Sequence, residues 1–116
     1  MRFAQTLALM VGVAACGGTP KPQARLESSQ AAIRGAEEVG AKDSPTAALH
    51  LKLAEEQREK AVELIKDDQN GRAEYLLMRS EADAELAVAL AREATAKAEA
   101  AKMKEQVDDL KRKANK

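Results

Sequence analysis

Few side chains in this sequence are of types that carry out chemistry. The chain has 116 residues, with one cysteine, Cys16, and one histidine, His50. A cysteine thiol can act as a nucleophile, a metal ligand or a site of acylation, and a histidine can act as a general base or a metal ligand. His50 lies between two leucines, with no cysteine or second histidine at metal-ligand spacing. We therefore expect a solvated or half-packed helical residue and no metal site.

The acidic residues and the serines give no stronger indication of catalysis. Alternate residues of a helix point to different faces, so the acidic groups around Glu55, Asp83 and Asp108 are expected to be solvated surfaces and not acid–base pairs. No histidine lies within helical reach of Ser28 or Ser80, and no glycine-rich phosphate loop is present. Lys+Arg 19 balance Asp+Glu 19, and aromatic residues make up 2%. We expect no enzyme activity, no cofactor and no nucleic-acid partner.

Cys16 follows a segment typical of an export signal. Arg2 supplies a positive charge, and residues 7–14 form an apolar run, ending in small residues, that is too short to span a bilayer. Residues 13–17 (VAACG) resemble the lipobox of bacterial lipoproteins. The resemblance implies that residues 1–15 are a cleaved signal peptide and that Cys16 is lipidated with fatty acyl chains such as palmitate, which anchor the protein in a membrane. A soluble secreted protein with an unpaired cysteine is the alternative.

The residue after the cysteine bears on the membrane that receives the anchor. In enterobacterial lipoproteins, an Asp at this position retains the protein at the inner membrane, and this sequence has Gly17. The resemblance therefore implies the periplasmic face of the outer membrane. A Gram-positive-type surface lipoprotein would carry the same box.

The remaining sequence predicts an all-α fold. Glycine and proline are few, and the β-forming aromatic residues are nearly absent. We expect residues 16–22 to form a flexible tether, lipidated as the lipobox resemblance implies, and residues 23–116 to form an alanine-rich helical domain. Apolar periodicity predicts three helices, at about 23–40, 45–66 and 72–114. The short break between the second and third predicts an antiparallel hairpin, with a long C-terminal helix.

Local signals mark the ends of these helices. Gly40 is expected to end the first helix. Ser44 is expected to cap the second, with Pro45 in its first turn. Gly71 or Asn70 is expected to take the left-handed conformation before the third helix.

The third helix is about twice as long as the second, so its partners can cover only its first half, to about residue 94. In the covered half, the cluster at residues 75–78 (YLLM) is expected to be core, although Tyr75 and Met78 could instead line a peptide groove of tetratricopeptide type. Beyond the covered half, an apolar stripe would face water in an isolated subunit; it consists of Met103, Val107 and Leu110. This stripe predicts either a partner or self-association face or a frayed tail.

Two resemblances suggest what such a chain does. The major murein lipoprotein of enterobacteria is also a small, acylated, alanine-rich helix, and it ends in a lysine joined to peptidoglycan; Lys116 corresponds to that lysine. Residues of about 24–98 resemble, in the order of their segments, the uncharacterised helical domain of small bacterial envelope lipoproteins, which in some relatives precedes an OmpA-like domain. These resemblances imply a non-catalytic, structural or adaptor module of the cell envelope. A tetratricopeptide-like binding module and a murein-linked tether through Lys116 are the alternatives.

Overall fold

The computed structural model describes residues 17–116. The expected signal peptide and Cys16 lie outside the described residues. The elements are α1 (Gln23–Glu38), a short 3-10 helix η1 (Ala41–Asp43), α2 (Pro45–Lys66) and α3 (Asn70–Ala114). No strand occurs in the described part of the chain. The predicted all-α fold, with its hairpin and its long last helix, is confirmed.

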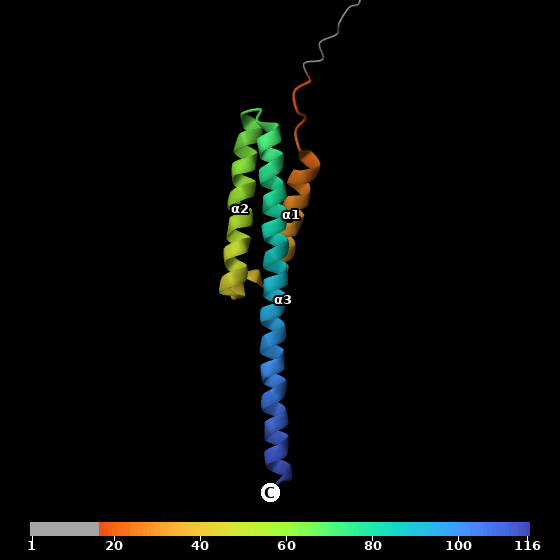
Figure 1. The fold of residues 1–116 in the computed structure, drawn as a ribbon, viewed down its shortest axis with the longest axis vertical. Coiled ribbons are helices and arrows are strands. Elements are labelled where there is room, and N and C mark those ends of the chain that lie inside the picture. Colours follow the sequence, from red (N-terminus) through yellow and green to blue (C-terminus); the bar gives the residue numbers. More distant parts are fainter. Residues whose placement is uncertain (1–16) are drawn as a thin grey trace, which may run out of the picture.

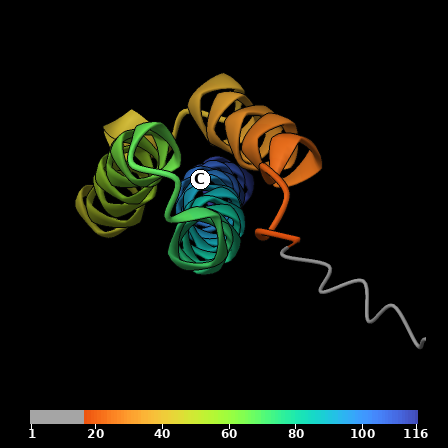
Figure 2. The same ribbon diagram turned by 90° about the horizontal axis from the view of Figure 1, so that it is seen from above.

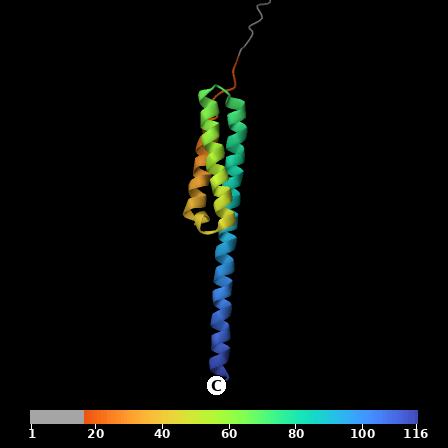
Figure 3. The ribbon, with the colours of Figure 1, turned by 90° about the vertical axis from the view of Figure 1, so that its left-hand side faces the viewer.

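The three helices form a short bundle from which α3 projects (Figure 1). Helices α2 and α3 run antiparallel, and α1 lies against the same half of α3 (Figure 3). Seen along the long axis, α1 and α2 occupy neighbouring sides of α3, and its remaining side carries no helix (Figure 2). Half of a 45-residue helix is therefore inside the bundle, and the other half extends beyond it.

Two residues with positive φ make the turns. Gly40 has φ 77° and ends the α1 segment as predicted, and a Cβ there would lie 2.9 Å from the carboxylate of Asp43. At the second turn the prediction was wrong, because Asp68, with φ 56°, takes the left-handed conformation. Helix α3 begins at Asn70 and includes Gly71 in its first turn.

The beginning of α2 agrees in position with the prediction but not in chemistry. Ser44 is the residue before the helix, in an extended conformation, and Pro45 is its first residue. The Ser44 side chain makes no capping hydrogen bond. The fixed φ of Pro45, which also lacks an N–H to be satisfied, is what favours the start of the helix here.

The core consists mainly of alanines. On α3 they belong to a buried seam that runs from the first turn to the middle of the helix: Ala73, Leu77, Ser80, Ala84, Ala87 and Ala91. Opposite it lie Ile33 and Ala36 of α1 and Leu51, Ala54 and Ala61 of α2. Small side chains let the helix axes approach closely, but each one removes little apolar area from water. Close packing of helix backbones thus replaces bulky side chains in this core.

The expected core cluster at residues 75–78 is only partly core. Leu77 is fully buried and Leu76 is half-buried, but Tyr75 is 62% exposed and Met78 is 47% exposed. Successive helical residues turn by about 100°, so a run of four cannot all face one pair of neighbours. The interpretation of Tyr75 and Met78 as core residues was wrong.

Candidate functional site

The two ends of the described chain lie at opposite ends of the molecule. Residues 17–22 precede α1 and lie near the α2–α3 turn, whereas the C-terminus is at the far end of α3 (Figure 1). The buried Asn70 side chain donates a hydrogen bond from Nδ2 to the backbone oxygen of Thr19, at 2.8 Å. This bond fixes the tether beside the first turn of α3. At 1.5 Å per residue, the 45 residues of α3 then extend about 67 Å from that point.

The distal half of α3 has no neighbour in the described part of the chain. Burial on α3 ends at Ala91, and from Thr95 onward the helix is exposed almost throughout. Met103 is 61% exposed, Val107 47% and Leu110 65%. The prediction that the first helices cover α3 only to about residue 94 is confirmed, and these three side chains form an uncovered apolar stripe.

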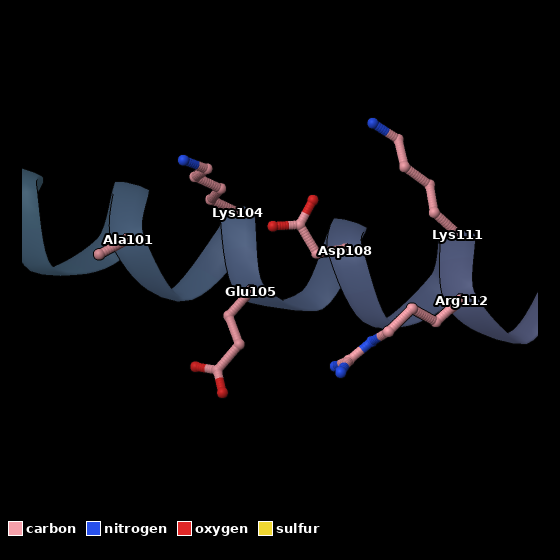
Figure 4. Close-up of a pocket in the computed structure, with 6 residues that line it drawn as sticks. All are labelled: Ala101, Lys104, Glu105, Asp108, Lys111 and Arg112. Atoms are coloured by element: carbon pink, nitrogen blue, oxygen red, sulfur yellow. The ribbon is translucent and has the colours of Figure 1, made fainter.

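The sides of this distal segment are highly charged. Lys104, Asp108 and Lys111 project from one side of the helix, and Glu105 and Arg112 project from the other (Figure 4). A shallow depression runs along these residues, but all of its lining comes from this one helix. It therefore has no second wall that could enclose a small ligand.

Polar side chains join the helices of the covered half. Glu81 accepts hydrogen bonds from Ser28 at 2.5 Å and from Arg25 at 3.3 Å, both on α1. Ser80, buried in the seam, donates to the backbone oxygen of Ala54 on α2, at 2.7 Å. These contacts tie both neighbouring helices to one turn of α3.

On the other flank of the same turn, Asp83 contacts α2. Its Oδ1 lies 2.9 Å from His50 Nδ1, and its Oδ2 accepts a hydrogen bond from Gln57 at 2.8 Å. The expectation that the carboxylates in this region are all solvated was wrong for Glu81 and Asp83. They lie on either side of the buried stripe, where α1 and α2 pack. His50 is half-buried, as predicted, and its carboxylate partner was not foreseen.

This polar cluster has the character of a structural contact. The recorded partner of His50 is a carboxylate, and Ser28 and Ser80 are bonded to Glu81 and to a backbone oxygen. Within residues 17–116, no group of three or more metal-ligating side chains comes together. Among the described helices, none is both long and apolar enough to cross a bilayer.

A hollow of about 430 Å³ lies between α2 and α3, near their turn. Tyr75 and Leu76 of α3 and Lys60 and Leu64 of α2 are among its lining residues. Tyr75 thus lines a surface hollow, whereas Met78, the other residue expected in a peptide groove, is not part of this lining.

Comparison with known proteins places this fold in a family. Residues 24–103 match the family described as a domain of unknown function, DUF4398. The chain belongs to that family. The DUF4398 match begins in α1 and includes the whole bundle, and it ends at Met103, inside the uncovered stripe. No curated protein and no solved structure matches the chain.

Proposed function

We propose that this DUF4398 protein is a lipid-anchored lipoprotein of the cell envelope that acts as a non-catalytic spacer or adaptor. In this proposal Cys16 carries the acyl chains, and the distal half of α3 is the part that meets other envelope components. The outer membrane, on its periplasmic side, is the proposed location. The lipobox-like residues 13–17 support the anchor, and the family match gives no activity that conflicts with it.

One structural observation carries the spacer role. The tether leaves the bundle beside the α2–α3 turn, where Thr19 is bonded to Asn70, and the uncovered stripe lies at the opposite end of α3. A membrane anchor just before the tether would therefore place the bundle near the membrane. The stripe would lie several tens of Å farther away, because α3 spans about 67 Å.

Cell fractionation tests the anchor. The Cys16→Ala variant should move from the membrane to the soluble fraction and lose incorporation of radiolabelled palmitate, because no thiol remains to be acylated. Ser28→Ala is a matched control that changes one small polar residue in the described bundle, and it should stay with the membrane. Retention of Cys16→Ala in the membrane fraction would contradict the lipoprotein proposal.

A second substitution tests the location. Gly17→Asp introduces the residue that retains enterobacterial lipoproteins at the inner membrane. Separation of the two membranes on a density gradient should show the wild-type chain in the outer membrane and the variant in the inner one. Wild-type protein in the inner membrane would contradict the outer-membrane assignment, and outer-membrane location of both proteins would show that residue 17 does not direct the sorting.

A murein-linked tether is a second candidate, favoured by the position of Lys116. This exposed lysine lies at the end of the molecule farthest from the tether. Lys116→Ala should abolish a peptidoglycan-bound pool that a murein hydrolase releases, whereas Lys113→Ala should leave the pool intact. The absence of a peptidoglycan-bound pool of the wild-type protein would contradict the murein-linked tether and favour the adaptor role.

A further inference from the structure

The apolar stripe on the distal half of α3 has the spacing of a coiled-coil seam. Its members are spaced alternately four and three residues apart and are all exposed: Ala96, Ala100, Met103, Val107, Leu110 and Ala114. We propose that residues 96–114 form a parallel, two-stranded coiled coil with the same residues of a second copy of the chain. A repeat of seven residues with apolar side chains at two positions is the pattern that brings helices together in this way.

The stripe is narrow, as a two-helix contact requires. On the opposite side of the helix, Glu105, Asp109 and Arg112 form a charged surface, and Arg112 is paired with Asp109. The alanines at the two ends of the stripe let two helices approach closely, and Met103, Val107 and Leu110 between them supply the larger apolar contacts. One flat seam with a charged back is suited to a single partner helix.

The bundle does not obstruct this contact. The positions of the stripe follow those of the buried seam by two residues, which is about 200° around the helix. The stripe therefore continues the side of α3 that faces away from α1 and α2 (Figure 2). Two bundles can lie side by side in a parallel dimer without α1 or α2 entering the interface.

Charges beside the stripe favour the parallel orientation. One flank carries Lys97, Lys104 and Lys111, each seven residues from the next, and the other carries Glu99, Gln106 and Lys113. In a parallel pair, Glu99 of each copy lies beside Lys104 of the other, which gives two ion pairs. An antiparallel pair in the same layers would bring Glu99 beside Lys113, but it would also bring Lys97 beside Lys111 and Lys104 beside its own copy. These like-charge contacts outnumber the ion pairs, so the lysine row disfavours the antiparallel arrangement.

Glu93 sets the upper limit of the interface. It occupies the next position of the repeat above Ala96, where a parallel pair would bring two carboxylates together. In the described chain, Glu93 is paired with Lys97 at 2.5 Å. The hydrogen bond and the charge of Lys97 lower the pKa of Glu93, so it remains ionised at neutral pH. The coiled coil accordingly begins below Glu93, where the bundle ends.

Cysteine crosslinking tests the contact and its direction. In the full chain carrying Cys16→Ser, each introduced cysteine is the only thiol. Parallel pairing places residue 110 of one copy against residue 110 of the other, so Leu110→Cys should form a disulfide-linked dimer under mild oxidation. Glu105→Cys, on the charged back, is the matched control and should form no disulfide-linked dimer, because the two copies of residue 105 point away from each other. Circular dichroism of both variants checks that the helices are intact.

Three crosslinking results would overturn the proposal. Equal crosslinking of Leu110→Cys and Glu105→Cys would show random collision. A helical Leu110→Cys protein that forms no disulfide-linked dimer would show that no second copy covers the stripe. A mixture of Met103→Cys and Val107→Cys chains that crosslinks better than Leu110→Cys would show antiparallel pairing.

A charge exchange gives an independent test. Glu99→Lys replaces the two ion pairs by like-charge contacts and should lower the dimer fraction at a fixed concentration several-fold, measured by analytical ultracentrifugation. Adding Lys104→Glu restores opposite charges in the parallel pair and should recover the dimer. In an antiparallel pair, Lys104→Glu would instead place the two substituted carboxylates, one from each copy, side by side. Failure of the second substitution to recover the dimer would overturn the parallel arrangement.

Discussion

The two halves of α3 are alike in sequence but different in surroundings. Both are rich in alanine, and both carry apolar residues spaced three and four apart. In the first half, Ala84 and Ala87 are completely buried between α1 and α2, whereas in the second half Ala98 and Ala101 are exposed. The comparison shows that an alanine stripe becomes core only where neighbouring helices reach it. Here the lengths of α1 and α2 decide where that is.

The largest expected effect separates the two halves at a leucine. Leu77 is 0% exposed, and Leu77→Ala should lower the free energy of unfolding by about 2–5 kcal/mol, because it removes buried apolar area and leaves a cavity. Leu110 is 65% exposed, and Leu110→Ala should change it by less than about 0.5 kcal/mol in dilute protein. Urea unfolding of both variants measures the difference. Equal losses would mean that the distal half is packed within a single chain.

An intermediate effect is expected from enlarging an alanine of the buried seam of α3. Ala87→Leu adds volume where three helices meet, and the resulting overpacking should cost about 1–3 kcal/mol. Ala101→Leu makes the same change where the spacing of the buried seam continues into the exposed half. It should leave the free energy of unfolding almost unchanged, since leucine is a good helix former. Thermal unfolding of the pair tests the boundary between the halves. A large loss in Ala101→Leu would contradict it.

The smallest effect concerns the polar contacts that only the covered half makes. Asp83→Ala removes the hydrogen bonds to His50 and Gln57 and should cost about 0.5–1.5 kcal/mol, because the site is only half-buried. Glu85→Ala, at an exposed neighbouring position, should have no measurable effect on the unfolding free energy. If the two variants unfold alike, the contact with His50 contributes nothing to stability.

Much of the fold was predictable because helices depend on local signals. The predicted range of α2 matches the structure at 45–66, and the predicted starts or ends of α1 and α3 differ from it by two residues. Gly40 was found because few other residues tolerate its φ of 77°. The second turn was missed, since residues 67–71 (DDQNG) include several residues that tolerate the left-handed conformation, and asparagine and glycine adopt it more often than aspartate. The bond from Asn70 to Thr19, 51 residues away, could not be predicted either, because it joins segments that are distant along the chain.

The candidate site, too, could be predicted from the sequence only in part. The uncovered stripe at Met103, Val107 and Leu110 was predictable from the unequal helix lengths. The roles of Glu81 and Asp83 were not, because nothing local distinguishes them from the exposed Glu85. Spacing around the helix identifies residues that flank a seam, but it does not say which flank a neighbouring helix covers.

By itself, the sequence determined the helices, their approximate ends and the excess length of α3 with its apolar stripe, since each depends on spacing along one chain. Only the tertiary structure decided that Tyr75 faces outward, that Asp83 holds His50, and that the tether and the stripe lie at opposite ends. The physical reason is that these features depend on which sides of α3 receive α1 and α2. That choice is made by packing among distant segments, and no local pattern records it.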